Sequence, residues 1–232
     1  MTKKSVLRSV FETLKNEMKV YDFTPSIGEQ YFIRKQKQSI FTYQFLIYDR
    51  TIIKTGEKGF QIEPYAWINV KDIENIYREI TQNTELKKET DFVTLGNSIA
   101  NLNANPDGIN RKRNQSLDLF IFDEENIPYV SWELMKHFKE TVFPYMLSNS
   151  TIARVDELLN KDPYEYCVHM SNDIYRFIKG LIAAKLNNSP EADKLFSIYS
   201  DLIIERDMPD NCKEEMNRLK LIWPEIGTKS VS

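Results

Sequence analysis

The stretches SIFTYQFLIY (residues 39–48) and FQIEPYAWINV (residues 60–70) decide the fold class of this chain. In the second stretch two sets of residues alternate: Phe60, Ile62, Ala66, Ile68 and Val70 against Gln61, Glu63, Tyr65, Trp67 and Asn69. Successive side chains of a strand point to opposite faces, so the alternation predicts a strand with one buried face. Pro64 has no N–H to give to a neighbouring strand, which places it at a sheet edge or a bulge.

Helical and strand patterns alternate around these two stretches. Residues 5–20 repeat apolar residues at helical spacing, QYFIRK (residues 30–35) favours a short strand, and residues 73–80 favour a short helix. The segment 101–116 is rich in turn residues and predicts a loop before a buried strand at 117–122. A helix is expected from about 128 to 143, with an apolar stripe of Trp132, Met135, Phe138 and Val142, and Pro144 should kink or end it.

Strand signals stop after residue 148. Helices are expected over 152–159, from Asp162-Pro163 to about 186, after Ser189-Pro190, and up to Trp223. Because strands and helices are segregated, we predict an α+β fold: a mostly antiparallel sheet packed by helices, then an all-helical region. The expected organisation is an α+β domain over 1–147, a helical domain over 148–223 and a flexible tail over 224–232.

Composition excludes several classes of protein. The chain has 232 residues, 41% of them hydrophobic, and a net charge of −3, which is typical of a packed globular protein. Its seven glycines form no G-x-G-x-x-G or G-x-x-x-x-G-K-[ST] motif, so Rossmann and P-loop enzymes are disfavoured.

There is no signal peptide and no long apolar run, so we expect a cytoplasmic protein without membrane contact. The bias toward Lys, Asn, Ile and Tyr is typical of AT-rich bacterial genomes.

Residues with metal-binding or nucleophilic side chains are scarce. The two cysteines, Cys167 and Cys212, make no disulfide framework, and the histidines, His137 and His169, have no metal-site spacing. On the helix expected there, Cys167 and His169 would point in different directions, which disfavours a nucleophile–base pair. We therefore expect no catalytic, cofactor-binding or metal-binding residues.

One acidic cluster keeps a hydrolase alternative open. Asp118 falls in the expected strand, and Asp123, Glu124 and Glu125 follow its end, where metal-dependent phosphodiesterases often carry acids. Acidic side chains are equally favoured there by the positive end of the following helix dipole.

Basic residues support a second alternative, nucleic-acid binding. Residues 1–116 hold 18 Lys and Arg against 14 Asp and Glu, whereas residues 117–232 hold 13 against 20. The candidate contacts are Arg34, Lys35, Lys37, Arg111, Lys112 and Arg113, with Tyr43, Tyr65 and Trp67 as rings that could stack on bases. The excess is small for a nucleic-acid-binding domain, so this function is not favoured.

The N-terminal helix, FIRKQKQSIFTYQFLIYDR (residues 32–50) and FQIEPYAWINVKDIENIYREI (residues 60–80) together resemble an uncharacterised bacterial family of unknown function. The resemblance covers about residues 5–145 and implies an immunity or adaptor role. Together with the missing catalytic motifs, it favours a non-catalytic module that binds a protein partner. We predict Tyr65 and Trp67 as the contact surface, because aromatic residues are enriched in interface hot spots. The alternative for Trp67 is burial beneath the helical half.

Overall fold

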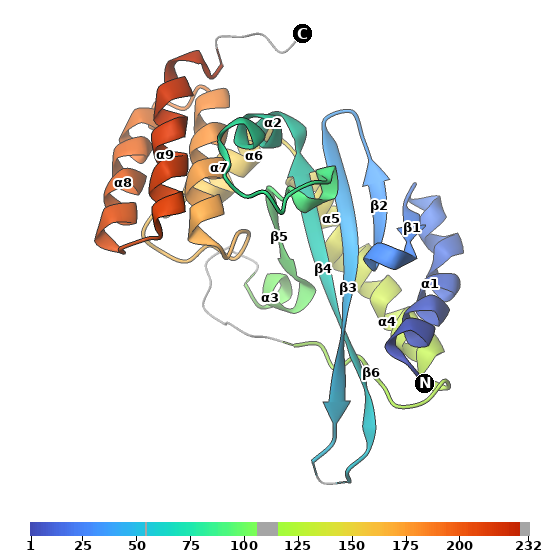
Figure 1. The fold of residues 1–232 in the computed structure, drawn as a ribbon. Coiled ribbons are helices and arrows are strands. Elements are labelled where there is room, and N and C mark those ends of the chain that lie inside the picture. Colours follow the sequence, from blue (N-terminus) through green and yellow to red (C-terminus); the bar gives the residue numbers. More distant parts are fainter. Residues whose placement is uncertain (54, 106–115, 228–232) are drawn as a thin grey trace. The chain divides into compact units, whose positions relative to one another are not determined.

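The computed structural model describes residues 1–53, 55–105 and 116–227 and is an α+β fold (Figure 1). Its sheet has the order β1-β2-β3-β4-β5, and β6 pairs with β4. The strands are β1 (Thr24–Ser26), β2 (Tyr31–Lys35), β3 (Ser39–Thr51), β4 (Lys58–Val70), β5 (Leu95–Ser98) and β6 (Phe120–Ile121). The pairs β1–β2, β2–β3 and β4–β6 are antiparallel. This confirms the fold class predicted from the alternating stretches.

The longer helices account for most of the remaining structure. They are α1 (Lys3–Val20), α2 (Lys71–Ile80), α3 (Ile99–Ala104), α4 (Asn126–His137), α5 (Phe143–Ser148), α6 (Ile152–Asn160), α7 (Asp173–Leu186), α8 (Ala192–Glu205) and α9 (Asp210–Ile222). A π-helical turn, Phe138–Val142, joins α4 to α5, and short 3-10 helices lie at Ile27–Glu29, Glu89–Asp91 and Trp223–Glu225.

The chain forms two compact units that the sequence boundaries do not reproduce. The first holds residues 1–67 with the described parts of 97–147, and the second holds 68–96 with 148–227. Residues 68–96 belong to the same unit as the helices from residue 148 onward. The reason is that α2 buries Ile73 and Tyr77 and packs against α7 and α9.

Aromatic packing builds the core of the first unit. In Figure 1, α1 and α4 run side by side, and α1 contributes Phe11, whose ring stacks on Phe32 of β2 at 4.6 Å. The Tyr43 hydroxyl of β3 donates to the Leu134 carbonyl of α4 at 2.9 Å. Fully burying one such apolar side chain stabilises the fold by about 1.5–3 kcal/mol. One face of the sheet is thus fixed against helices.

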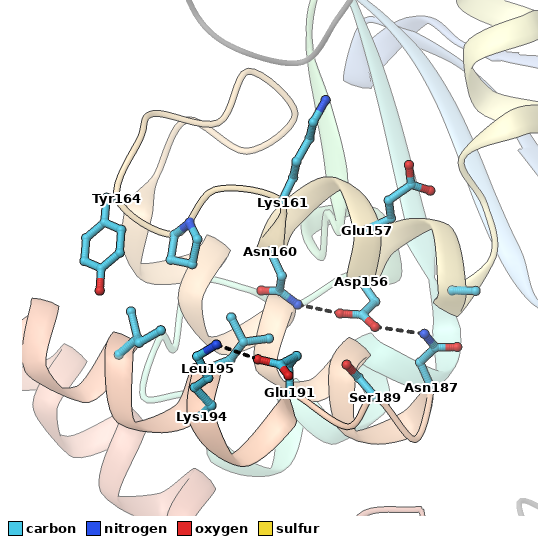
Figure 2. A pocket seen from close by; sticks show the side chains of 13 residues that line it. Asp156, Glu157, Asn160, Lys161, Tyr164, Asn187, Ser189, Glu191, Lys194 and Leu195 are labelled. Atoms are coloured by element: carbon cyan, nitrogen blue, oxygen red, sulfur yellow. Dashed lines mark hydrogen bonds and ion pairs between the residues drawn. The ribbon is translucent and has the colours of Figure 1, made fainter.

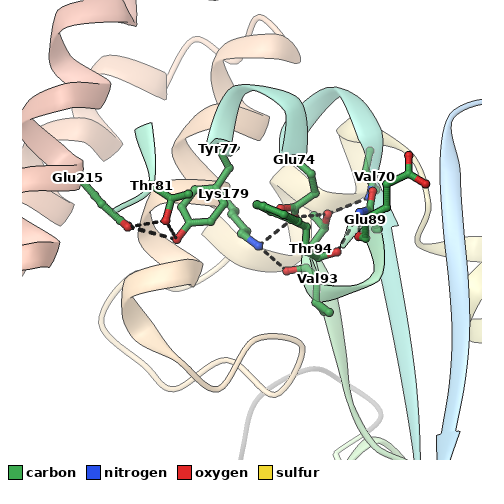
Figure 3. A network of polar contacts seen from close by, with 11 residues as sticks. Val70, Glu74, Tyr77, Thr81, Glu89, Val93, Thr94, Lys179 and Glu215 are labelled. Atoms are coloured by element: carbon green, nitrogen blue, oxygen red, sulfur yellow. Dashed lines mark hydrogen bonds and ion pairs between the residues drawn. The ribbon is translucent and has the colours of Figure 1, made fainter. Parts of the chain in front are cut away.

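A buried polar network organises the core of the second unit (Figure 3). The Lys179 ammonium of α7 lies 3.0 Å from Glu74 Oε1 of α2, and the exposed fractions of these side chains are 3% and 0%. Lys179 also donates to the Val93 carbonyl at 2.6 Å, and the Thr94 hydroxyl donates to Glu74 at 2.7 Å. Burial lowers the pKa of Lys179, and Glu74 opposes that effect.

A second carboxylate of the network holds the end of α2. Glu215 of α9 is 2% exposed and accepts hydrogen bonds from the Thr81 hydroxyl at 2.7 Å and the Gln82 N–H at 3.1 Å. The Tyr77 hydroxyl lies 3.2 Å from its Oε2 atom. These bonds tie the end of α2 to α9.

Several local expectations are wrong. Helix α3 occupies residues 101–104 of the expected loop at 101–116, and the Ser98 side chain caps it by accepting from the Asn101 N–H; residues 106–115 of that loop lie outside the described part of the chain. The strand expected at 117–122 is limited to Phe120–Ile121. The expected interruption near Pro144, in contrast, is present: α4 ends at His137, a π-helical turn follows over Phe138–Val142, and Pro144 is the second residue of α5.

The C-terminal half shows two further corrections. No helix begins at Asp162-Pro163; α7 begins at Asp173, and the Asn172 side chain caps it by accepting from the Ile174 N–H at 3.1 Å. The tail expected from 224 also starts too early, because Trp223–Glu225 is a 3-10 helix and Ile226 is 7% exposed. Residues 228–232 lie outside the described part of the chain.

Trp132 does not belong to the buried stripe of α4. Its side chain is 58% exposed, next to Tyr129 at 60% exposed, while Ile127, Val130 and Leu134 face the core. Met135, Phe138 and Val142 of the predicted stripe are buried, so the helical spacing was wrong only at its first position.

Lys179→Met should lower the free energy of unfolding by about 3–5 kcal/mol in urea denaturation, because it leaves the Glu74 carboxylate buried without its cation. Glu74→Gln combined with Lys179→Met should recover part of that loss, because the uncompensated charge is gone. Lys194→Met, which breaks an exposed pair with Glu191, is the matched control and should cost less than about 1 kcal/mol. A loss from Lys179→Met as small as the control's would contradict a structural role for the buried pair.

Candidate functional site

The two long strands of the first unit carry a face that is not fully buried. Side chains alternate along β3 and β4, and the set opposite Tyr43 and Phe45 is partly exposed. We call this set the open face; its members are Gln44, Leu46, Tyr48, Glu63, Tyr65 and Trp67. Both predicted contact residues, Tyr65 and Trp67, therefore lie on one surface.

Tyr65 and Trp67 form a fixed aromatic pair. They stand two residues apart on β4, and their rings stack with centroids 5.2 Å apart and planes 16° apart. The Trp67 indole N–H donates to Gln44 Oε1 on β3 at 2.8 Å, which fixes the orientation of the indole ring. The Trp67 side chain is partly exposed.

Tyr48 and Arg50 extend the open face along β3. Burial raises the pKa of Tyr65, and the charge of Glu63 and the neighbouring Tyr48 raise it further. The Tyr65 hydroxyl therefore keeps its proton at neutral pH. The Arg50 guanidinium lies 5.4 Å from the centre of the Tyr48 ring and donates to Gln61 Oε1 at 2.6 Å. Gln44 and Tyr48 belong to no sequence motif. The only sequence signal that could have assigned them to the open face is the alternation of side chains along β3.

The basic residues considered for nucleic acid are not gathered on this face. Arg34 lies 3.7 Å from Asp22 and 5.5 Å from the centre of the Phe143 ring, among the helices of the opposite face. Lys35 and Lys37 are exposed around the β2–β3 turn, and Tyr43 is buried. Arg111, Lys112 and Arg113 lie outside the described residues.

The acidic cluster has a local structural role. The Asp123 carboxylate accepts a hydrogen bond at 3.1 Å from the N–H of Asn126, the first residue of α4. Asp118 precedes β6 instead of lying in it, and Glu124 and Glu125 are exposed in the turn. Among the described residues no group of three or more His, Cys, Asp and Glu side chains is placed to hold a metal ion.

Cys167 and His169 lie in the segment between α6 and α7, not on a helix as expected. Both are buried, and the Cys167 thiol contacts the Leu158 carbonyl at 3.5 Å, while burial raises the pKa of that thiol. The His169 carbonyl accepts from the Gly96 N–H at 2.7 Å. Burial, reinforced by the cations of Arg154 and Lys161, lowers the pKa of His169 to about 4.

Comparisons with family models, with curated proteins and with solved structures give no match to this chain. Within the described residues, no helix has the length and apolar character needed to cross a membrane. The function must therefore be argued from the surfaces of the molecule.

The His169 Cε1–H resonance should titrate with a midpoint near pH 4 in an NMR pH series. The unfolded chain takes up this proton near pH 6.5 and the folded chain only near pH 4, so this group favours unfolding increasingly as pH falls between those values. The stability lost over that window is about 3 kcal/mol. A midpoint near 6.5 would show that His169 is solvated rather than buried.

Proposed function

We propose that this chain is a cytoplasmic protein-binding module of the immunity or adaptor type, and that the open face is its contact surface. The observation that supports this best is the stacked pair of Tyr65 and Trp67, which is partly exposed on a sheet whose other face packs on helices.

The pair has the physical properties of an interface anchor. Large aromatic rings bury much area for the loss of only two side-chain torsions, and Trp and Tyr are enriched among hot-spot residues. The hydrogen bond from Trp67 to Gln44 orders the indole before any partner arrives. A partner therefore loses little entropy in ordering this surface.

The charges of the open face indicate the chemistry of the partner. Glu63 lies beside Tyr65, and it contributes to the raised pKa of that tyrosine. Arginine stacks on aromatic rings and pairs with carboxylates in fixed geometry. The partner we propose is thus a protein surface that offers an arginine flanked by apolar side chains.

The same geometry makes the two alternatives weaker proposals. Glu63 next to the stacked rings would repel a phosphate backbone. The Arg50 cation at the end of the open face is engaged with Gln61 and the Tyr48 ring, and Arg34 contacts Asp22 rather than the open face. For a hydrolase, the Asp123 carboxylate is already hydrogen-bonded to the first backbone N–H of α4, and no group of three or more His, Cys, Asp and Glu side chains among the described residues is placed to hold a metal ion.

Trp67→Ala should weaken partner binding by about 30-fold or more, because hot-spot residues contribute at least about 2 kcal/mol. The partner is first captured from the source organism's lysate on immobilised chain, with and without nuclease, and its affinity is then measured by calorimetry. Trp132→Ala is the matched control: it removes an exposed tryptophan from α4 and should leave the affinity unchanged.

Three results would contradict the proposal. Equal binding by wild type and a folded Trp67→Ala variant would exclude the open face. Loss of binding in Trp132→Ala alone would move the surface to α4. Capture that disappears on nuclease treatment would favour nucleic acid. Thermal unfolding of each variant checks that the fold is retained.

A further inference from the structure

The second unit contains a cavity of about 650 Å³ that the proposed function does not use. It lies between α6, the turn that joins α7 to α8, and the first turns of α8 (Figure 2). Its walls are largely apolar, and they include Pro163, Tyr164, Leu195 and Ile198. The volume falls within the range of roughly 300–1,000 Å³ that small-molecule sites occupy.

Of the three carboxylates that line this cavity, those of Asp156, Glu157 and Glu191, the Asp156 carboxylate is the buried one. Asp156 of α6 is 8% exposed, and each of its two oxygens accepts one amide hydrogen bond. Asn160 donates to Oδ1 at 2.7 Å, and Asn187 donates to Oδ2 at 2.8 Å (Figure 2). Two neutral amides from different elements thus fix the carboxylate in one orientation.

The supporting groups are themselves held in place. The Asn160 side chain donates to the Gly180 carbonyl at 2.9 Å and accepts from the Tyr199 hydroxyl at 2.9 Å. A Cβ atom at Gly180 would come within 2.5 Å of Asn160 Oδ1, so this close approach requires glycine. The carboxylate is therefore preorganised through a chain of contacts that begins in α7 and α8.

The carboxylate lacks a cationic partner within the described residues. Lys194 pairs with Glu191 at 2.8 Å, and Glu157 pairs with Arg154 at 2.5 Å. Lys161 extends away from Asp156 in Figure 2. A largely buried carboxylate bonded only to amides leaves a negative charge that an incoming cation would neutralise.

We propose that this cavity binds an ammonium or guanidinium group carried on an apolar stem. The cation would meet the Asp156 carboxylate, and the stem would lie against the wall of Pro163, Leu195 and Ile198. A free amphipathic amine and the lysine or arginine side chain of a peptide share this chemistry.

The test is an NMR titration of the full chain with 2-phenylethylamine, with 2-phenylethanol as the uncharged probe of the same shape. The amine should give saturable shifts in the backbone amides around the cavity, and the alcohol should bind at least tenfold more weakly. A parallel titration with N-acetyl-lysine and N-acetyl-arginine methylamides distinguishes the sources: tighter binding of either indicates a protein side chain, and tighter binding of the amine indicates a small molecule.

Asp156→Asn keeps the shape of the side chain, removes its charge and should weaken amine binding at least tenfold. Glu157→Gln is the matched control at the rim of the same cavity and should change the affinity less than twofold. Ala153→Trp adds bulk at an exposed position of the cavity lining and should also abolish binding, which keeps the test decisive if Asp156→Asn fails to fold.

Any of three results overturns the inference. The first is the absence of saturable shifts in the amides that line the cavity. The second is equal binding of amine and alcohol, and the third is full binding by a folded Asp156→Asn variant, because in both cases the carboxylate would play no part.

Discussion

The contact between Lys179 and Glu74 constrains the second unit more than any other. An ammonium and a carboxylate taken out of water each cost several kcal/mol, which is recovered only if they meet in good geometry and their remaining bonds are satisfied. The Val93 carbonyl and the Thr94 hydroxyl meet part of this requirement. These groups come from α2, from the segment before β5 and from α7, so the contacts of this pair join residues 68–96 to the helices of the same unit.

The first unit follows a different principle. Its aromatic core covers one face of the sheet, and strand alternation then presents the other set of side chains on the open face. Tyr65 and Trp67 lie on that face because side chains alternate along β4 and those of Ala66 and Ile68 are buried. The two proposed sites differ accordingly: one is a flat aromatic surface fixed by a sheet, and the other is a cavity with a single oriented carboxylate.

Much of this architecture can be read from local patterns. The two-residue period predicts β3 and β4 and puts Tyr65 and Trp67 on one face, and the helical period predicts α1, α2 and most of the later helices. What cannot be predicted rests on long-range contacts. No local signal pairs Lys179 with Glu74, brings Gln44 to Trp67, or gathers Asp156, Asn160 and Asn187 around one cavity. β1 and β5 are too short for a periodic signal.

The central claim is that the open face is where this chain contacts another protein. Replacing Tyr65 by a photo-crosslinking phenylalanine derivative in living cells of the source organism tests it most directly, with the same replacement at exposed Tyr129 as the reference. We expect one protein adduct of defined mass from position 65 and none of that mass from position 129. No adduct at 65, or the same adduct at both positions, would contradict the claim.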